Sequence, residues 1–315
     1  MKTNTFYLPS SNGINKLRCI MWIPETDIRG IVQISHGMQE HIGRYKSFAS
    51  FLTLHGYVVI GHDHVGHGYS VNSKDNYGFF SPNTKDGRCI SSALAVKDLY
   101  HVTRYVKAKY PNKPCYLLGH SMGSLLVRRY LMTKPDYVDG AILLGTGNLD
   151  TVSLTFGTTL LELLTKMYGE HHISPLVKKL LFGSYNKMIK HPRTSIDWIC
   201  TDPKVVHKYQ NDSMCGFDFT LNGYNLLIST MEYILNPKNI RRLSKNTPIY
   251  LTSGLLDPVG HYGNDIPDIY ISYQNAGVKD ITIKLYPHCR HEILNEKNHK
   301  EVYANILRWI ECHQS

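Results

Sequence analysis

The sequence predicts an α/β protein in which a mostly parallel sheet of about eight strands is flanked by helices. Short apolar runs alternate with segments whose apolar residues recur at helical spacing. Most of these runs are apolar throughout, which is typical of strands covered on both faces of a parallel sheet. The alternation stops after residue 147 and resumes after residue 223. We therefore expect one core, formed by residues 1–147 and 224–315, with a mainly helical cap inserted at residues 148–223.

The first half of the chain supplies most of the predicted core elements. Thr5–Leu8 and Lys16–Pro24 lie on either side of the turn-forming segment SSNG and predict a β-hairpin. Buried strands are expected at Gly30–Ser35, Tyr57–Gly61, Cys115–Leu118 and Gly140–Leu144. Helices are expected at Tyr45–His55, where Gly56 forms the C-cap, and at Ser91–Tyr110 and Ser124–Met132.

The second half begins with the cap and then returns to the α/β pattern. The cap contains two apolar stretches, Leu154–Tyr168 and Ile173–Phe182. After it, helices are expected at Ile228–Leu243, Asp268–Ala276 and Lys300–Cys312, and strands at Pro248–Ser253 and Ile281–Tyr286.

The net charge of +10 could indicate an anionic partner. The basic residues are scattered, however, and their densest groups are pairs such as Lys178-Lys179 and Arg241-Arg242. Since no basic run of five or more occurs, the pattern favours an ordinary solvated surface, and we expect no nucleic-acid partner.

The seven cysteines are widely spaced, odd in number and free of any CxxC pair. This pattern argues against a zinc finger or a disulfide framework and favours reduced thiols in a cytoplasmic protein. The N-terminal segment has no apolar core of the kind found in secretory signals, and no apolar run approaches the roughly 18 residues of a membrane span.

Gly119-His120-Ser121-Met122-Gly123 matches the GxSxG pattern of a nucleophile elbow. It follows a predicted strand and precedes a predicted helix, which is the context that the motif requires. A bare GxSxG arises by chance in roughly one chain in ten of this length, so the flanking elements carry the prediction. We expect Ser121 to be a catalytic nucleophile at the N-terminus of a helix.

A serine nucleophile needs a histidine base that a carboxylate orients. Asp257 follows the strand Pro248–Ser253 through a short turn and is the predicted carboxylate. Two histidines, His288 and His291, follow the last predicted strand. Position in the loop favours His291 but leaves both open.

Two backbone N–H groups should bind the oxyanion of the reaction. One is expected from Met122, directly after the nucleophile, and the other from Met38 in the loop His36-Gly37-Met38. Because the donors are main-chain groups, the identity of these side chains matters little.

The chain resembles the monoglyceride lipase and lysophospholipase group of α/β hydrolases, whose bacterial members are often labelled serine-aminopeptidase-like. Five motifs carry the resemblance, in the family's order and over essentially the whole chain outside the cap: HGMQEHIGRY (36–45), GHDHVGHGYS (61–70), LLGHSMGS (117–124), GLLDPVGHYG (254–263) and LYPHCRHEILNE (285–296). The cap resembles the bacterial branch more than the mammalian lipases.

The resemblance implies an α/β-hydrolase fold with Ser121, Asp257 and His291 as the catalytic triad. Its His-Glu pair falls on His291-Glu292, which selects His291 over His288. It also implies oxyanion donors at Met38 and Met122.

The resemblance further implies substrate contacts at Gly37, Gln39 and His120. Gln39 departs from the glycine or other small residue that many relatives carry at that position, so the preference for acyl group or headgroup is open there.

His62, Asp63, His64 and His67 together offer enough ligands for a metal ion. In the family this DHxGHG segment is a strand end and a tight loop, so the resemblance implies local hydrogen bonds for its polar side chains instead. We expect no metal site and no cofactor.

The expected activity is ester hydrolysis through an acyl-enzyme, on a monoacyl lipid such as a monoacylglycerol or lysophospholipid, or on a simpler carboxylic ester. One alternative is an amidase or aminopeptidase, which would need an acidic pair near the site; Glu40 and Glu162 are the candidates. A non-catalytic binding protein is a third hypothesis, but no triad member is missing. The apolar stretches of the cap could line an acyl pocket, contact a membrane surface or pack on the core.

Overall fold

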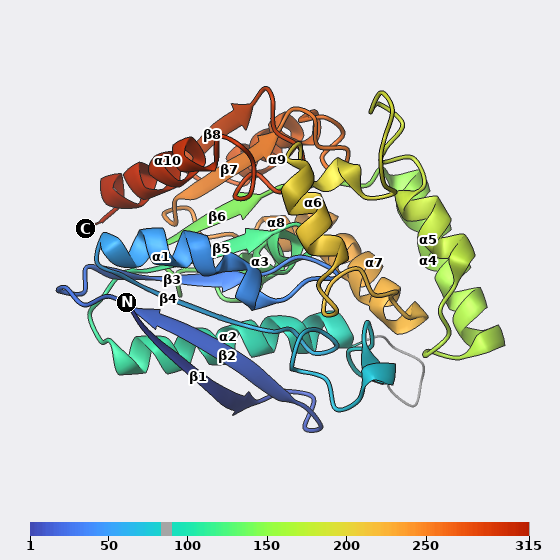
Figure 1. Ribbon diagram of the computed structural model, residues 1–315, viewed down its shortest axis with the longest axis horizontal. Coiled ribbons are helices and arrows are strands. Elements are labelled where there is room, and N and C mark those ends of the chain that lie inside the picture. Colours follow the sequence, from blue (N-terminus) through green and yellow to red (C-terminus); the bar gives the residue numbers. More distant parts are fainter. Residues whose placement is uncertain (83–89, 315) are drawn as a thin grey trace.

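The computed structural model describes residues 1–82 and 90–314, and within them eight strands form one sheet (Figure 1). Their order across the sheet is β1-β2-β4-β3-β5-β6-β7-β8. The hairpin strands β1 and β2 are antiparallel, β2 is antiparallel to β4, and the remaining pairs are parallel. The strands are β1 (Lys2–Pro9), β2 (Lys16–Ile23), β3 (Gly30–Ser35), β4 (Tyr57–His62), β5 (Cys115–His120), β6 (Gly140–Leu144), β7 (Ile249–Gly254) and β8 (Ile281–Tyr286).

Helices cover both faces of the sheet. On one face, α1 (Lys46–Leu54) and α10 (His299–Cys312) enclose an apolar core with residues of β2 to β8. On the other face, α2 (Ser91–Lys109), α3 (Met122–Thr133) and α9 (Asp265–Asn275) enclose a second core, to which α7 (Leu221–Leu235) also contributes. The inner strands β3 to β7 are buried along their whole length, as a parallel sheet covered on both sides requires.

The predicted fold class, a mostly parallel sheet of eight strands flanked by helices, is confirmed. Gly30–Ser35, Gly140–Leu144 and Ile281–Tyr286 form strands with the predicted bounds. The single helix predicted over Ile228–Leu243 is wrong, because α7 ends at Leu235 and the short helix α8 (Pro237–Ile240) follows. Pro237 cannot continue α7, and it instead begins α8 with Asn236 as the N-cap.

The inserted segment forms a helical layer beyond the carboxyl ends of the parallel strands, at the right of Figure 1. It contains α4 (Thr151–Tyr168), α5 (Pro175–Phe182) and α6 (Pro203–Gln210), together with a short 3₁₀ turn at Asp197–Ile199. The boundary expected at residue 223 lies just inside α7, which contacts both the cap helix α4 and the core helices α2 and α3. Among the described residues, no helix is long and apolar enough to cross a bilayer.

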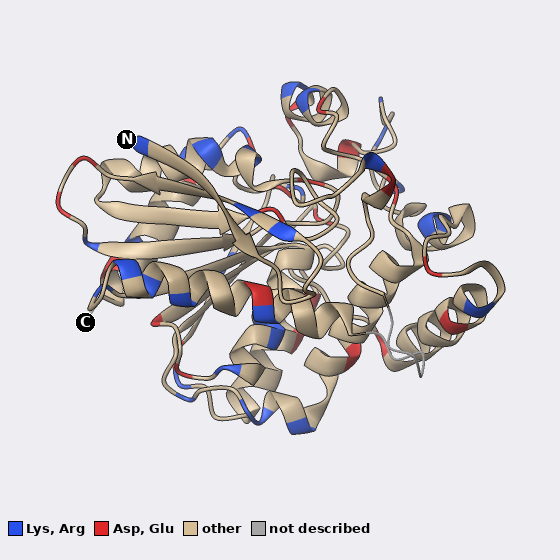
Figure 2. Cartoon of the chain, turned by 90° about the horizontal axis from the view of Figure 1, so that it is seen from below, with Lys and Arg blue, Asp and Glu red and all other residues tan. Residues whose placement is uncertain are grey.

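Charged residues are spread over many elements of the core and the cap. Figure 2 shows Lys and Arg interspersed with Asp and Glu along the described chain. The net charge of +10 is therefore distributed over the molecule.

Candidate active site

Ser121 occupies a sharp turn between β5 and α3. Its backbone has φ 55° and ψ −122°, a conformation that residues with a side chain rarely adopt. The turn is held on both sides, because the N–H of Ser121 donates to the carbonyl of Leu144 on the neighbouring strand and the N–H of Ser124 donates to the carbonyl of Ser121. The serine therefore lies at the carboxyl edge of the sheet and at the N-terminus of α3.

The two glycines of the motif are required by close backbone contacts. A Cβ on Gly119 would lie 2.5 Å from the carbonyl oxygen of Gly123, and a Cβ on Gly123 would overlap the carbonyl oxygen of Ser35. The elbow thus packs directly on the end of β3, where the loop of the expected oxyanion donor begins.

Asp257 and His291 meet at the same edge of the sheet, although 34 positions separate them. Nδ1 of His291 lies 2.9 Å from Oδ2 of Asp257, and both side chains are buried. The hydroxyl of Ser253 and the N–H of Val259 also donate to Asp257, at 3.2 and 2.9 Å. Since the carboxylate only accepts, Nδ1 of His291 carries the proton and Nε2 is free to act as a base. His288, the competing candidate, is exposed.

A cavity of about 270 Å³ lies between this edge of the sheet and the cap. Ser121, His291, Met38 and Met122 all line it, so the structure brings the predicted nucleophile, base and oxyanion residues to one space. Asp257 lies behind His291, outside the lining. The walls are mainly apolar, and the cap contributes Leu181, Phe182, Ile199 and Trp198.

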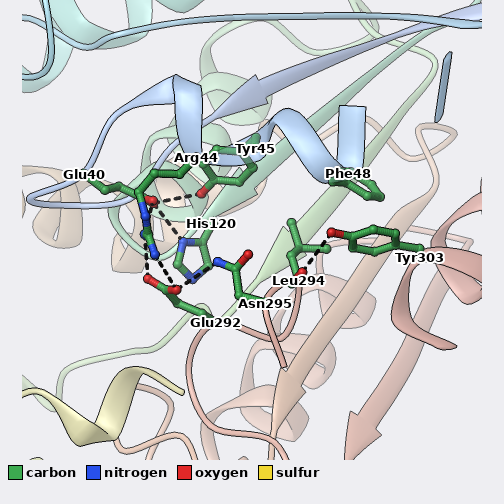
Figure 3. Close-up of a pocket in the computed structure, with 9 residues that line it drawn as sticks. All are labelled: Glu40, Arg44, Tyr45, Phe48, His120, Glu292, Leu294, Asn295 and Tyr303. Atoms are coloured by element: carbon green, nitrogen blue, oxygen red, sulfur yellow. Dashed lines mark hydrogen bonds and ion pairs between the residues drawn. The ribbon is translucent and has the colours of Figure 1, made fainter. Parts of the chain in front are cut away.

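A buried network of charges lies beneath the oxyanion loop (Figure 3). Arg44 donates to Oε2 of Glu40 at 2.6 Å and binds both carboxylate oxygens of Glu292 at 2.7 Å. Although burial opposes the charge of Glu40, Arg44 and His120 hold the pKa of that carboxyl well below its usual range. Glu40 follows the loop of the predicted oxyanion donor and Glu292 follows the predicted base, His291, so Arg44 ties the two loops together.

Glu40 and His120 connect this network to Gly37 and to the predicted base, His291. Oε1 of Glu40 accepts the N–H of Gly37 at 2.6 Å, and it lies 3.2 Å from Nδ1 of His120. Nε2 of His120 lies 3.3 Å from the carbonyl oxygen of His291. Both partners of the His120 ring only accept, so both ring nitrogens donate and the ring is an imidazolium. Burial lowers the pKa of His120, but the hydrogen bond and the charge of Glu40 outweigh it, and the pKa is raised.

The three residues expected to contact substrate, Gly37, Gln39 and His120, all line the cavity. Their polar groups are nevertheless engaged within the protein. The side-chain amide of Gln39 donates to the carbonyl of Phe217 at 2.5 Å, and the carbonyl of Gln39 accepts the hydroxyl of Tyr209 at 2.8 Å. Gln39, the residue that departs from the family pattern, thus joins the oxyanion loop to the cap.

The local hydrogen bonds expected for the segment 62–67 form at Asp63, His64 and His67 but not at His62. Both ring nitrogens of His62 are buried without a partner among the described residues. Burial lowers the pKa of His62 to about 3 and the pKa of His67 to about 4. These rings contact those of His36 and His64, so the segment forms a cluster of neutral histidines behind the oxyanion loop.

A different group has side-chain atoms close enough for a metal ion: His41, Asp212 and Cys215, whose ligand atoms lie within 4.8 Å of one another. Both nitrogens of His41 are already engaged, because Nε2 lies 2.9 Å from Asp212 and Nδ1 accepts the N–H of Gly43. We therefore interpret this group as a hydrogen-bonded link between core and cap.

Two features of the site were not predicted from the sequence. The Glu40–Arg44 pair has the four-residue spacing of a helical ion pair, which could have indicated it. Trp198 of the cap lies with its ring centroid 5.2 Å from that of His291. No local pattern distinguishes this tryptophan, because its contact depends on how the cap docks.

The chain is similar in sequence to a known family and to several known proteins. A family model described as serine aminopeptidase, S33, matches residues 26–298. A monoglyceride lipase homolog of monkeypox virus is 27% identical over 300 residues, which cover 93% of each chain. A monoacylglycerol lipase of Mycolicibacterium smegmatis is 27% identical over 306 residues, 96% of this chain and 95% of the relative.

The fold is also similar to solved structures. A thermostable carboxyl esterase of Bacillus coagulans, solved with glycerol, superposes with a TM-score of 0.91 at 28% identity, and all of both chains is covered. A soluble variant of monoglyceride lipase from Saccharomyces cerevisiae superposes with a TM-score of 0.77 at 18% identity, covering 100% of this chain and 97% of that one. The second likeness bears on the fold alone.

Proposed function

The chain belongs to the serine aminopeptidase S33 family and is a carboxylic ester hydrolase of the α/β-hydrolase type, and from that premise we propose that it cleaves monoacyl lipids through an acyl-enzyme on Ser121. One observation carries the proposal: Ser121 and the Asp257-oriented His291 face one cavity whose walls are mainly apolar. Nucleophile, base and a space for an acyl chain therefore coincide.

In the proposed mechanism, His291 takes the proton of Ser121 as its Oγ attacks the ester carbonyl. Asp257 holds the imidazole in the correct tautomer and stabilises the imidazolium that forms. The N–H groups of Met38 and Met122 bind the oxyanion of the tetrahedral intermediate. His291 then protonates the leaving alcohol and activates a water molecule that releases the acid.

The lining of the cavity favours a neutral monoacylglycerol over a lysophospholipid. Among the described lining residues, Lys178 and His120 are the cationic side chains, and a carboxylate of the protein engages each of them: Asp218 for Lys178 and Glu40 for His120. Glu40 and Glu292 place carboxylates at the same lining, and Arg44 binds both. A phosphate group would thus meet little that compensates its charge, whereas a glycerol headgroup needs only hydrogen bonds.

The amidase alternative has less support. An aminopeptidase would need free carboxylates near the site to bind an α-amine, and Glu40 is engaged by Arg44, Tyr45, His120 and the N–H of Gly37. Glu162, the other candidate, is exposed on α4 and absent from the lining described above. Neither carboxylate is placed to recognise an amine.

We further propose that the cap contacts a lipid surface. Val152, Phe156, Leu163 and Met167 lie on one face of α4, since their spacing keeps them within about one sixth of a helical turn. All four are exposed, by 55 to 78%. Exposed apolar patches of this kind mark interaction sites, and a monoacyl lipid substrate partitions into membranes. We call these four residues the α4 apolar face.

A cytoplasmic location completes the proposal. The described cysteines are free thiols, which suits a reducing compartment.

A substrate panel tests the proposed function. Wild-type protein and Ser121→Ala are assayed with 4-nitrophenyl esters of increasing chain length, a monoacylglycerol, a lysophospholipid and aminoacyl anilides. We expect the wild type to cleave esters, with monoacylglycerol above lysophospholipid, and Ser121→Ala to lose activity at least about 10³-fold. Turnover of anilides alone would contradict the proposal.

A further inference from the structure

Arg128 is a buried cation on α3 without an acidic partner. Its side chain is 2% exposed. Nε donates to the hydroxyl of Tyr273, Nη1 to the carbonyl of Gly147 and Nη2 to Oδ1 of Asn148, each at 2.9 Å. No carboxylate is among the contacts that the described residues make with this guanidinium. A buried charge is costly unless every donor is satisfied, so its neutral partners must hold fixed positions.

Asn148 is held from two sides. Its side-chain oxygen accepts from Arg128, and its backbone N–H donates to Oδ2 of Asp265 at 2.8 Å. The preceding residue, Gly147, packs so closely on the carbonyl of Val259 that a Cβ there would overlap it. The end of the loop after β6 is thus clamped between α3 and the start of α9.

The clamped loop connects the reacting groups to the cap. At its start, the carbonyl of Leu144 accepts the N–H of Ser121. Gly145 then lies against His291, where a Cβ would be 3.1 Å from the imidazole ring. Gly147, Asn148 and Leu149 line the cavity, and α4 begins at Thr151. Arg128 itself is outside the lining.

We infer that Arg128 is a positioning residue that fixes the cavity wall at residues 147–149 and thereby sets how well long acyl chains are bound. The inference rests on the proposed ester hydrolysis. Arg128 does not touch the reacting atoms, so short esters, which do not reach along the wall, depend on it little. A long acyl chain requires the wall in place. The planar guanidinium reaches Tyr273 and the loop residues 146–148 at once from three separate nitrogens. A lysine ammonium presents its donors from one atom and cannot span the same separation.

Arg128→Lys tests the inference, with Tyr273→Phe as a matched control. The control removes the Arg128 partner that lies on α9 and leaves the contacts to Thr146, Gly147 and Asn148. Steady-state kinetics are measured with a two-carbon and a twelve-carbon 4-nitrophenyl ester. We expect Arg128→Lys to raise KM for the long ester about tenfold, with kcat for the short ester within about twofold of wild type. Tyr273→Phe should keep the wild-type ratio of the two KM values.

Hydrogen exchange of the peptide that contains Asn148 supplies a readout that is independent of activity. The Asn148 amide donates to Asp265, so loss of the clamp should speed its exchange at least about tenfold in Arg128→Lys, and not in Tyr273→Phe. The inference would be overturned if Arg128→Lys lowered kcat/KM equally for both esters, or if hydrogen exchange were unchanged in folded Arg128→Lys. If wild-type protein cleaves no ester, the proposed function fails, while the exchange experiment still decides whether Arg128 clamps the loop.

Discussion

Glu40 links the loop of the proposed oxyanion donor to the proposed base, His291, through its two carboxylate oxygens. One oxygen accepts from Gly37, Tyr45 and His120, and the other accepts from Arg44. Because the side chain is buried, each of these contacts replaces hydration that folding removed. The charge of Glu40 also keeps His120 protonated, so that His120 can donate to the carbonyl of His291.

Glu40→Gln should therefore disturb catalysis as well as stability. The amide retains an acceptor but leaves Arg44 with one carboxylate and lowers the pKa of His120. We expect the free energy of unfolding to fall by about 3 kcal/mol and kcat/KM to fall roughly tenfold or more, through displaced reacting groups. Chemical denaturation and ester kinetics measure the two effects.

Tyr45→Phe is the matched control, because it removes one hydrogen bond to Glu40 and no charge. It should cost about 1 kcal/mol and leave kcat/KM close to the wild-type value. Equal kinetic losses in both variants would show that the charge of Glu40 is not what matters.

At the scale of elements, α4 carries apolar residues on two opposite sides. Leu161 is buried toward the core, whereas Phe156 and Leu163 are exposed on the α4 apolar face. Lys166 lies exposed on the same helix and suits an anionic lipid surface.

Phe156→Glu should weaken binding to vesicles that contain anionic phospholipid about tenfold or more, since it replaces apolar contact area by a charge. Co-sedimentation with vesicles measures the binding. Hydrolysis of a short water-soluble ester should stay unchanged. Ile271→Glu is the control. It changes an exposed apolar residue of α9, outside the cap, and should bind as the wild type does. Equal binding by all three proteins would refute the lipid contact.

For the whole molecule, the cluster of His36, His62, His64 and His67 makes stability depend on pH in mildly acidic solution. Burial lowers the pKa of each ring, to about 3 for His62 and about 4 for His67. In the unfolded chain these histidines titrate near their ordinary pKa of about 6.5. The unfolded state therefore binds more protons than the folded state below that pH. The contribution of these neutral rings to the free energy of unfolding is therefore fully present above about pH 6.5. It is lost as the pH falls toward the pKa values of the folded state.

Each such histidine should cost on the order of 2 kcal/mol of stability between pH 6.5 and pH 5. Guanidinium denaturation at pH 7, 6 and 5 measures the slope. His62→Phe should reduce this loss of stability by the contribution of one histidine. His288→Gln, at an exposed position, should leave the loss unchanged. A stability independent of pH over this range would contradict the burial of neutral rings.

The fold was predictable because parallel strands covered on both faces appear as short apolar runs. β3, β6 and β8 agree with such runs to the residue. The helix after the cap was predicted less well, since apolar spacing continues through Asn236 and hides the break at Pro237.

The site was predictable where chemistry imposes a local pattern and not where it depends on distant packing. Ser121 follows from the glycines that its turn requires. The choice between His288 and His291 depended on family resemblance, because both lie in one loop. The Arg44–Glu292 pair joins residues 248 positions apart, and no local pattern reports such a contact.

The assignment of Ser121 as nucleophile is the central claim, and intact-protein mass spectrometry after treatment with a fluorophosphonate tests it most directly. We predict one adduct per chain on wild-type protein and on Ser47→Ala, which changes an exposed serine of α1, and none on Ser121→Ala. An adduct that persists on folded Ser121→Ala would contradict the account.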